Sequence, residues 1–133
     1  MKDWRAETAG DLAEARSRLQ ETLRTISGEP TKEQLHSVWL AYVDIEKSVF
    51  FVKVELDAES PGVFVKTSLY RVPDERQAIA FALRSLERGA ESLASGDLLD
   101  CLGRLRESRN YLRVLLREKR LAGLRRTAHR DRA

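Results

Sequence analysis

Three charged side chains interrupt otherwise apolar helical faces, and their types and spacing are the best suited to chemistry in this chain. Glu46 and Lys53 lie within the apolar face of the stretch 31–56, and Arg109 lies near the centre of a later leucine stripe. If these faces meet, Glu46 and Arg109 pair in or beside the core, because an unpaired buried charge is costly. We predict a buried polar cluster of these three residues and Tyr42. The simpler interpretation is a structural ion pair that sets helix register, or long side chains that reach solvent.

Arg109 and Asn110 also open the hexapeptide RNYLRV, which resembles the Arg-Asn-x-x-x-His stretch of HEPN domains. HEPN domains are small, often dimeric helical bundles, and many members with that stretch are ribonucleases or antitoxin partners. The resemblance covers six residues, and Val114 stands where the family has its histidine. It implies a helical bundle and, as one alternative function, a ribonuclease-type protein that lacks the usual histidine.

The C-terminal quarter of the chain is strongly basic. Residues 1–103 carry 13 basic and 18 acidic side chains, whereas residues 104–133 carry 11 basic and 3 acidic ones. Such a ridge suits a phosphate backbone and predicts RNA binding that weakens with salt. Tyr111 is its only aromatic residue, although single-strand binders usually stack bases on several. The alternative is a solvated helix end whose cations complement the helix dipole. The candidate RNA-binding residues are Arg106, Arg113, Arg117, Arg120, Arg125 and Arg126.

Signals of an enzyme are sparse. The two histidines, His36 and His129, are far apart and have no metal-ligand spacing, and there is no glycine-rich phosphate loop or nucleophile elbow. The single cysteine, Cys101, cannot form an intramolecular disulfide and lies near the apolar edge of its helix, where a buried, inert thiol is expected. We therefore expect no metal, no cofactor and no catalytic residue.

Composition bounds the class of protein. A chain of 133 residues with 34% charged and 42% hydrophobic side chains is typical of one soluble globular domain. The first residues are acidic where a signal peptide needs an apolar core, and no run approaches the roughly 18 apolar residues of a membrane span. These patterns favour the cytoplasm. Dense charge with few Asn, Gln and Met residues also favours a thermophilic source.

Periodicity and capping residues predict four helices. Thr31 and Gln34 form a capping box, Asp74 and Gln77 form a similar pair, and Gly96 ends the third helix. The link after Gly96 is so short that the last two helices must be antiparallel neighbours. The second helix is apolar around most of its circumference, so we expect it to be a central rod surrounded by the others. The expected helices span residues 3–27, 31–57, 74–95 and 97–121.

A β-hairpin over residues 49–72 is the structural alternative. Both halves are rich in β-branched and aromatic residues, and Pro61-Gly62 lies between them. An unbroken helical stripe and the marginal stability of a lone hairpin favour the helix. We therefore predict an all-α, antiparallel four-helix bundle with a long connection between its second and third helices. The bundle is expected to span 1–118, followed by a basic, flexible tail over 119–133.

Apolar side chains exceed what one narrow bundle interior can hold. Phe51 and Val54 on the second helix, Phe81 on the third and Trp4 near the start are the candidates for an interface, which is most often a two-fold homodimer. The alternative is that the connection 57–73 folds back over Phe51. The predicted function is a non-enzymatic, self-associating interaction module. An RNA-binding accessory protein and the ribonuclease-type bundle are the alternatives.

Overall fold

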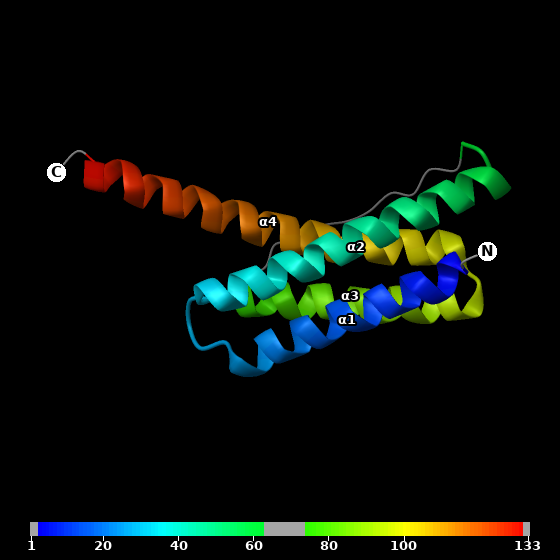
Figure 1. Cartoon of the computed structure of the whole chain (residues 1–133), viewed down its shortest axis with the longest axis horizontal. Helices are drawn as coiled ribbons and strands as arrows, with labels where there is room; N and C mark the ends of the chain where they lie inside the picture. The colour runs from blue at the N-terminus through cyan, green and yellow to red at the C-terminus, as the bar shows by residue number, and fades with distance from the viewer. Residues whose placement is uncertain (1–2, 63–73, 132–133) are drawn as a thin grey trace.

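The protein is an all-α four-helix bundle, as predicted. The computed structural model describes residues 3–62 and 74–131, and these contain no β-strand. The helices are α1 (Trp4–Thr25), α2 (Lys32–Glu59), α3 (Glu75–Ser95) and α4 (Leu98–Asp131). Figure 1 shows the four helices running alongside one another, with the C-terminal part of α4 projecting beyond the other three.

The helix starts follow from the predicted capping residues. The Thr31 hydroxyl accepts a hydrogen bond from the Gln34 amide at 3.1 Å, and the Thr31 amide donates to the Gln34 side chain at 2.8 Å, which completes the capping box of α2. The Asp74 carboxylate accepts from the Gln77 amide at 2.8 Å and starts α3. Gly96 ends α3 in the left-handed region at φ 83°.

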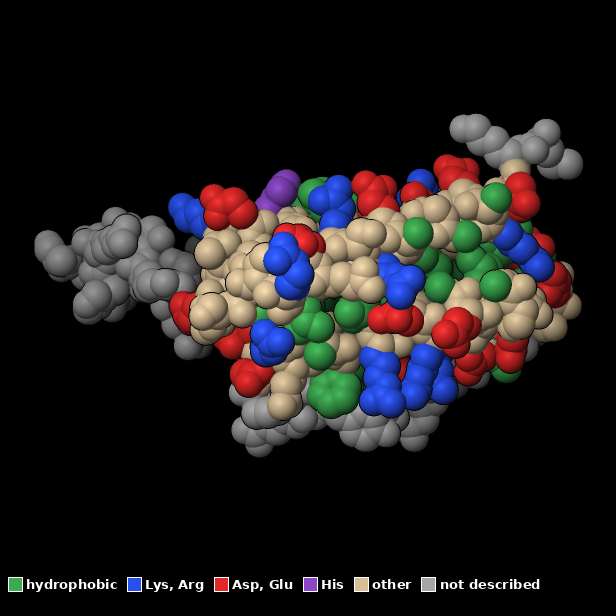
Figure 2. All heavy atoms as spheres, turned by 90° about the horizontal axis from the view of Figure 1, so that it is seen from below, with side chains coloured by type: hydrophobic (Ala, Val, Ile, Leu, Met, Phe, Trp, Pro, Cys, Tyr) green, Lys and Arg blue, Asp and Glu red, His purple; other side chains and the backbone are tan. Residues whose placement is uncertain are grey.

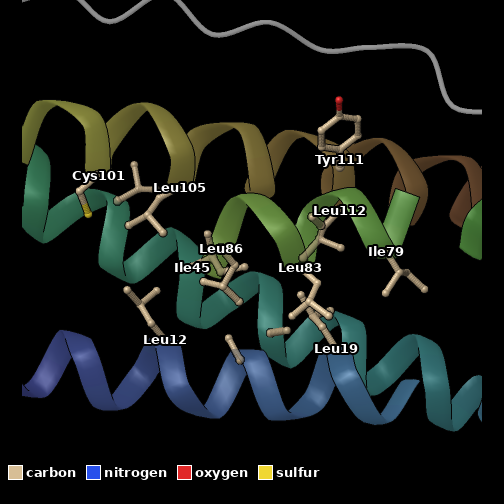
Figure 3. Packing of buried hydrophobic residues seen from close by; sticks show 14 of the residues in the cluster. Leu12, Leu19, Ile45, Ile79, Leu83, Leu86, Cys101, Leu105, Tyr111 and Leu112 are labelled. Atoms are coloured by element: carbon tan, nitrogen blue, oxygen red, sulfur yellow. The ribbon is translucent and has the colours of Figure 1, made fainter. Parts of the chain in front are cut away.

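The helices form a square in which each packs on two neighbours. α2 lies between α1 and α4, and α3 lies on the other side of the same two helices. α3 and α4 approach closely at Gly89, where an added Cβ would lie 2.8 Å from Leu105 Cδ2. The buried Ser108 hydroxyl donates to the Ala82 carbonyl at 2.7 Å and joins the same two helices. Figure 3 shows the core side chains that the four helices contribute, including Leu12, Leu19, Ile45, Ile79, Leu86, Leu105 and Leu112.

The expectation that the second helix is a central rod is wrong. α2 occupies a corner of the square, and its buried face includes the small residues Ala41 and Ser48, both fully buried. Trp39 lies on the opposite side of the helix from these two residues, so it is outside the core and about half exposed. The apolar residues that surround α2 therefore belong in part to the molecular surface.

Two helix boundaries differ from those expected. Residues 49–59 belong to α2, so the hairpin is excluded for that half, while residues 63–72 lie outside the described part of the chain. α4 continues to Asp131 instead of ending near 121. Most of the connection 57–73, which in the alternative to a dimer interface would fold back over Phe51, also lies outside the described residues. The flexibility of the segment 119–133 stays a prediction.

Candidate functional site

The predicted pair between Glu46 and Arg109 is present in the structure. An Arg109 guanidinium nitrogen lies 3.3 Å from Glu46 Oε1, and the Arg109 side chain is 18% exposed while that of Glu46 is 37% exposed. The pair therefore lies beside the core, where α2 meets α4, and not inside it. Asn110 supports it, because its Oδ1 accepts from Arg109 Nε at 3.3 Å and from Nη2 at 3.2 Å.

Arg113 and Tyr42 join the same contact. Arg113 Nη2 lies 3.9 Å from Glu46 Oε2. The pKa of Arg113 is raised, mainly by a hydrogen bond with the Tyr42 side chain and further by the nearby Glu46 carboxylate, against the opposing effect of burial. The site thus joins one carboxylate, two guanidinium groups and a phenol, an arrangement that holds α2 against α4.

Lys53 does not join this cluster in the way we expected. Its ammonium lies 2.7 Å from Asp57 Oδ1, one helical turn further along α2. This is an ordinary i,i+4 pair on a helix surface and contributes little to stability. Of the four residues in the predicted cluster, the structure brings together Glu46, Arg109 and Tyr42.

The basic residues of α4 are in different environments. The pKa of Arg106 is lowered by burial and by repulsion from Arg109. Arg113, Arg117 and Arg120 are all exposed, and Arg113 lies 3.9 Å from Glu46. Arg125 and Arg126 also belong to α4, but their side chains lie outside the described part of the chain.

An ion cluster around Lys119 was missed by the sequence analysis. The Lys119 ammonium lies 2.6 Å from Glu75 Oε1 and 3.1 Å from Glu29 Oε1, and its side chain is only 15% exposed. Hydrogen bonding to Glu75 is the main reason that the pKa of Lys119 is raised, and it lowers the pKa of Glu75 in turn. This Lys119 clasp joins α4 to the start of α3 and to the connection between α1 and α2.

The four predicted interface residues lie in separate places. Trp4 is half-buried against the core, with the Arg5 guanidinium 5.5 Å from its ring centre. Phe81 is partly exposed and stacks on Tyr111 with ring centres 5.6 Å apart. Phe51 is half-buried. Val54 is about half exposed and belongs to an apolar surface on the outer side of α2.

That surface, which we call the α2 stripe, consists of Trp39, Val43, Phe50 and Val54. Their exposed fractions are 48%, 41%, 62% and 51%. At about 100° per residue, the four side chains fall within an arc of about 60° that points away from the core. This spacing could have been recognised in the sequence, but the wide apolar surface of the helix made its outward arc look like core.

Charged side chains cover much of the remaining surface. On the face shown in Figure 2, acidic and basic side chains are interspersed. Pairs such as Lys47–Asp11 at 3.2 Å and Arg16–Glu87 at 3.5 Å join neighbouring helices. Within the described residues, no group of three or more His, Cys, Asp or Glu side chains is placed to hold a metal ion. No helix in that part of the chain is both long and apolar enough for a membrane span.

The site and fold together define the class of protein: an all-α four-helix bundle with an exposed apolar stripe on one helix. In comparisons with known proteins, no family model, no curated protein and no solved structure matches this chain.

Proposed function

We propose that this chain is a self-associating protein-interaction module, and that the α2 stripe is its binding surface. The single observation that supports this proposal most strongly is the exposure of the four stripe residues on one outward arc of α2. Single exposed apolar residues are normal, but large apolar side chains gathered on one face are typical of an interaction site. The proposal assigns no reaction to the chain and includes a cytoplasmic location.

The experiment is light scattering or sedimentation of the full chain over a range of concentrations. We expect a mass above that of the monomer. Phe50→Glu is expected to weaken self-association by about tenfold or more, because it places a charge where apolar contact is needed. Leu99→Glu is the matched control, since Leu99 is also an exposed apolar residue but lies at the start of α4. A monomer at every concentration, or an association unchanged by Phe50→Glu, would overturn the proposal.

RNA binding through α4 is the second candidate, supported by the exposure of Arg117 and Arg120 on that helix. Binding of a labelled mixed-sequence RNA is expected to weaken steeply with salt. The double substitution Arg117→Ala and Arg120→Ala should reduce both the affinity and the salt dependence, and Arg16→Ala on α1 is the control. Cleavage of that RNA, lost in Arg109→Ala without loss of folding, would instead support the ribonuclease-type alternative.

A further inference from the structure

An exposed aromatic side chain of α2 lies beside the basic residues of α4. Trp39 is 48% exposed and stacks on Tyr42, with the ring centres 5.7 Å apart. The Tyr42 side chain in turn has a hydrogen bond with Arg113 of α4. Contacts from Trp39 through Tyr42 to Arg113 therefore join an exposed indole ring to a basic helix.

The direction of the two helices places Trp39 along α4. Tyr42 contacts Arg113, and Glu46, one turn later on α2, contacts Arg109, one turn earlier on α4. The two helices are therefore antiparallel, as Figure 1 also shows. Trp39 precedes Tyr42 by about one turn, so it lies level with the turn of α4 that follows Arg113.

Four arginines of α4 lie on the side of that helix that faces α2. At about 100° per residue, they fall within an arc of about 60°. Arg113 contacts α2 directly, and the charge of Asp57 on α2 acts on Arg106. These four residues, which we call the arginine row, are Arg106, Arg113, Arg117 and Arg120.

The exposed end of the arginine row is the part nearest Trp39. Arg113, Arg117 and Arg120 are exposed, and Arg117 lies one turn beyond Arg113, at the level of Trp39. Glu46 is the carboxylate 3.9 Å from Arg113, and it also lies 3.3 Å from Arg109, which offsets its charge. A surface with an open aromatic ring and three open guanidinium groups results.

This combination suits a single-stranded nucleic acid. Such strands bind where cations follow the phosphates and aromatic rings stack on the bases. Tyr111, the aromatic residue of α4 itself, is buried and stacked on Phe81, so it is poorly placed to take a base. Trp39 supplies the stacking ring from α2 instead.

We propose that Trp39 and the exposed end of the arginine row form a binding site for single-stranded RNA. The indole ring stacks on one base, and Arg113, Arg117 and Arg120 contact the neighbouring phosphates. This inference rests on the second proposed function, RNA binding through α4, and adds to it the residue of α2 that selects single strands over duplexes.

Substitutions separate stacking from charge. Trp39→Ala should weaken binding of a labelled single-stranded RNA about tenfold, while the slope of log affinity against log salt stays unchanged, because no charge is removed. Trp39→Phe keeps a ring and should retain most of the affinity. Arg117→Ala should lower both the affinity and the salt slope. Phe81→Ala is the matched control, since Phe81 is also a partly exposed aromatic residue but stacks on Tyr111, on the opposite side of α4 from the arginine row.

Tryptophan fluorescence reports on the stacking directly. The chain has two tryptophans, Trp4 and Trp39. In a Trp4→Phe chain, single-stranded RNA should quench the fluorescence of Trp39. A strand of the same length without bases should not quench it, and a duplex, whose bases already stack on one another, should quench it much less. The Trp39→Phe chain, which keeps only Trp4, should show no quenching.

The outcomes distinguish this inference from the proposed functions. Salt-dependent RNA binding that Trp39→Ala does not weaken, or that favours the duplex, would overturn the Trp39 site and leave RNA binding through α4 intact. A Trp39→Ala chain that self-associates less but binds RNA equally well would also overturn it and would place Trp39 in a contact between copies. A full chain that binds no RNA at low salt would overturn both RNA proposals.

Discussion

At the scale of single residues, Glu46 shows how strongly burial decides the value of an ion pair. A fully buried partner for Arg109 would be worth several kcal/mol, because its removal would leave an unpaired charge inside the protein. The Glu46 side chain is instead more than a third exposed, so water screens the pair and hydrates Arg109 when its partner is lost.

We therefore expect Glu46→Ala to lower the free energy of unfolding by about 1 kcal/mol or less. The measurement is urea denaturation at one protein concentration, at low and at high salt, and the difference between the two proteins should shrink as salt is added. A loss of several kcal/mol that salt does not change would mean that the pair is shielded from solvent.

Cys101 illustrates the opposite extreme of burial. It is fully buried in α4, and desolvation, with nearby Asp100 and Asp97, raises the pKa of its thiol to about 12. The reactive thiolate is therefore scarce at neutral pH. This agrees with the inert thiol expected from its place at the apolar edge of the helix.

At the scale of helices, the Lys119 clasp predicts a specific dependence of stability on pH. The pKa of Glu75 is lowered in the folded protein, so its contribution is complete above the ordinary value near 4.5 and is lost as the pH falls through the folded value. The pKa of Lys119 is raised, so its contribution is complete below about 10.5 and is lost as the pH rises through the folded value.

Glu75→Gln should accordingly reduce the free energy of unfolding by about 1–2 kcal/mol at pH 7 and by much less at an acidic pH below the lowered pKa of Glu75, where the carboxyl of the unchanged chain is protonated. Urea denaturation at both pH values measures this difference. Glu91→Gln, at an exposed position on the same helix, is the control. An equal loss at both pH values would show that the charge of Glu75 does not matter.

Two helical glycines provide a matched test of helix packing. Gly10 in α1 has nothing within 4 Å of an added Cβ, whereas a Cβ at Gly89 would lie 2.8 Å from the fully buried Leu105. Gly10→Ala should stabilise the protein by about 0.5–1 kcal/mol, because alanine is the better helix former. Gly89→Ala should have the opposite sign, since overpacking typically costs about 1–3 kcal/mol and outweighs that gain. Thermal denaturation of the two variants measures both effects, and stabilisation by both would show that α3 and α4 separate easily.

At the scale of the whole molecule, features set by neighbouring residues could be predicted, whereas most features set by the packing of distant helices could not. The Glu46–Arg109 pair is the exception, because charges within two apolar helical faces need partners. The Thr31–Gln34 capping box and the Gly96 turn depend on a few adjacent residues, and the structure confirms them. The outward position of Trp39 depends on which side of α2 its neighbours occupy. The Lys119 clasp joins residues as much as 90 positions apart, which no local pattern reveals.

The C-terminal part of α4 that projects beyond the other three helices, which we call the overhang, has a further consequence for folding. An isolated helix must first form a nucleus, an unfavourable step that makes peptides shorter than about 12–15 residues poorly helical in water. The packed part of α4 serves as that nucleus, so each turn of the overhang needs only to propagate an existing helix. A free peptide of residues 121–131, which is shorter than this length, should accordingly show little helical circular dichroism, although α4 in the full chain is helical to Asp131. If the peptide were strongly helical alone, the overhang would owe its structure to its own sequence and not to the bundle that starts it.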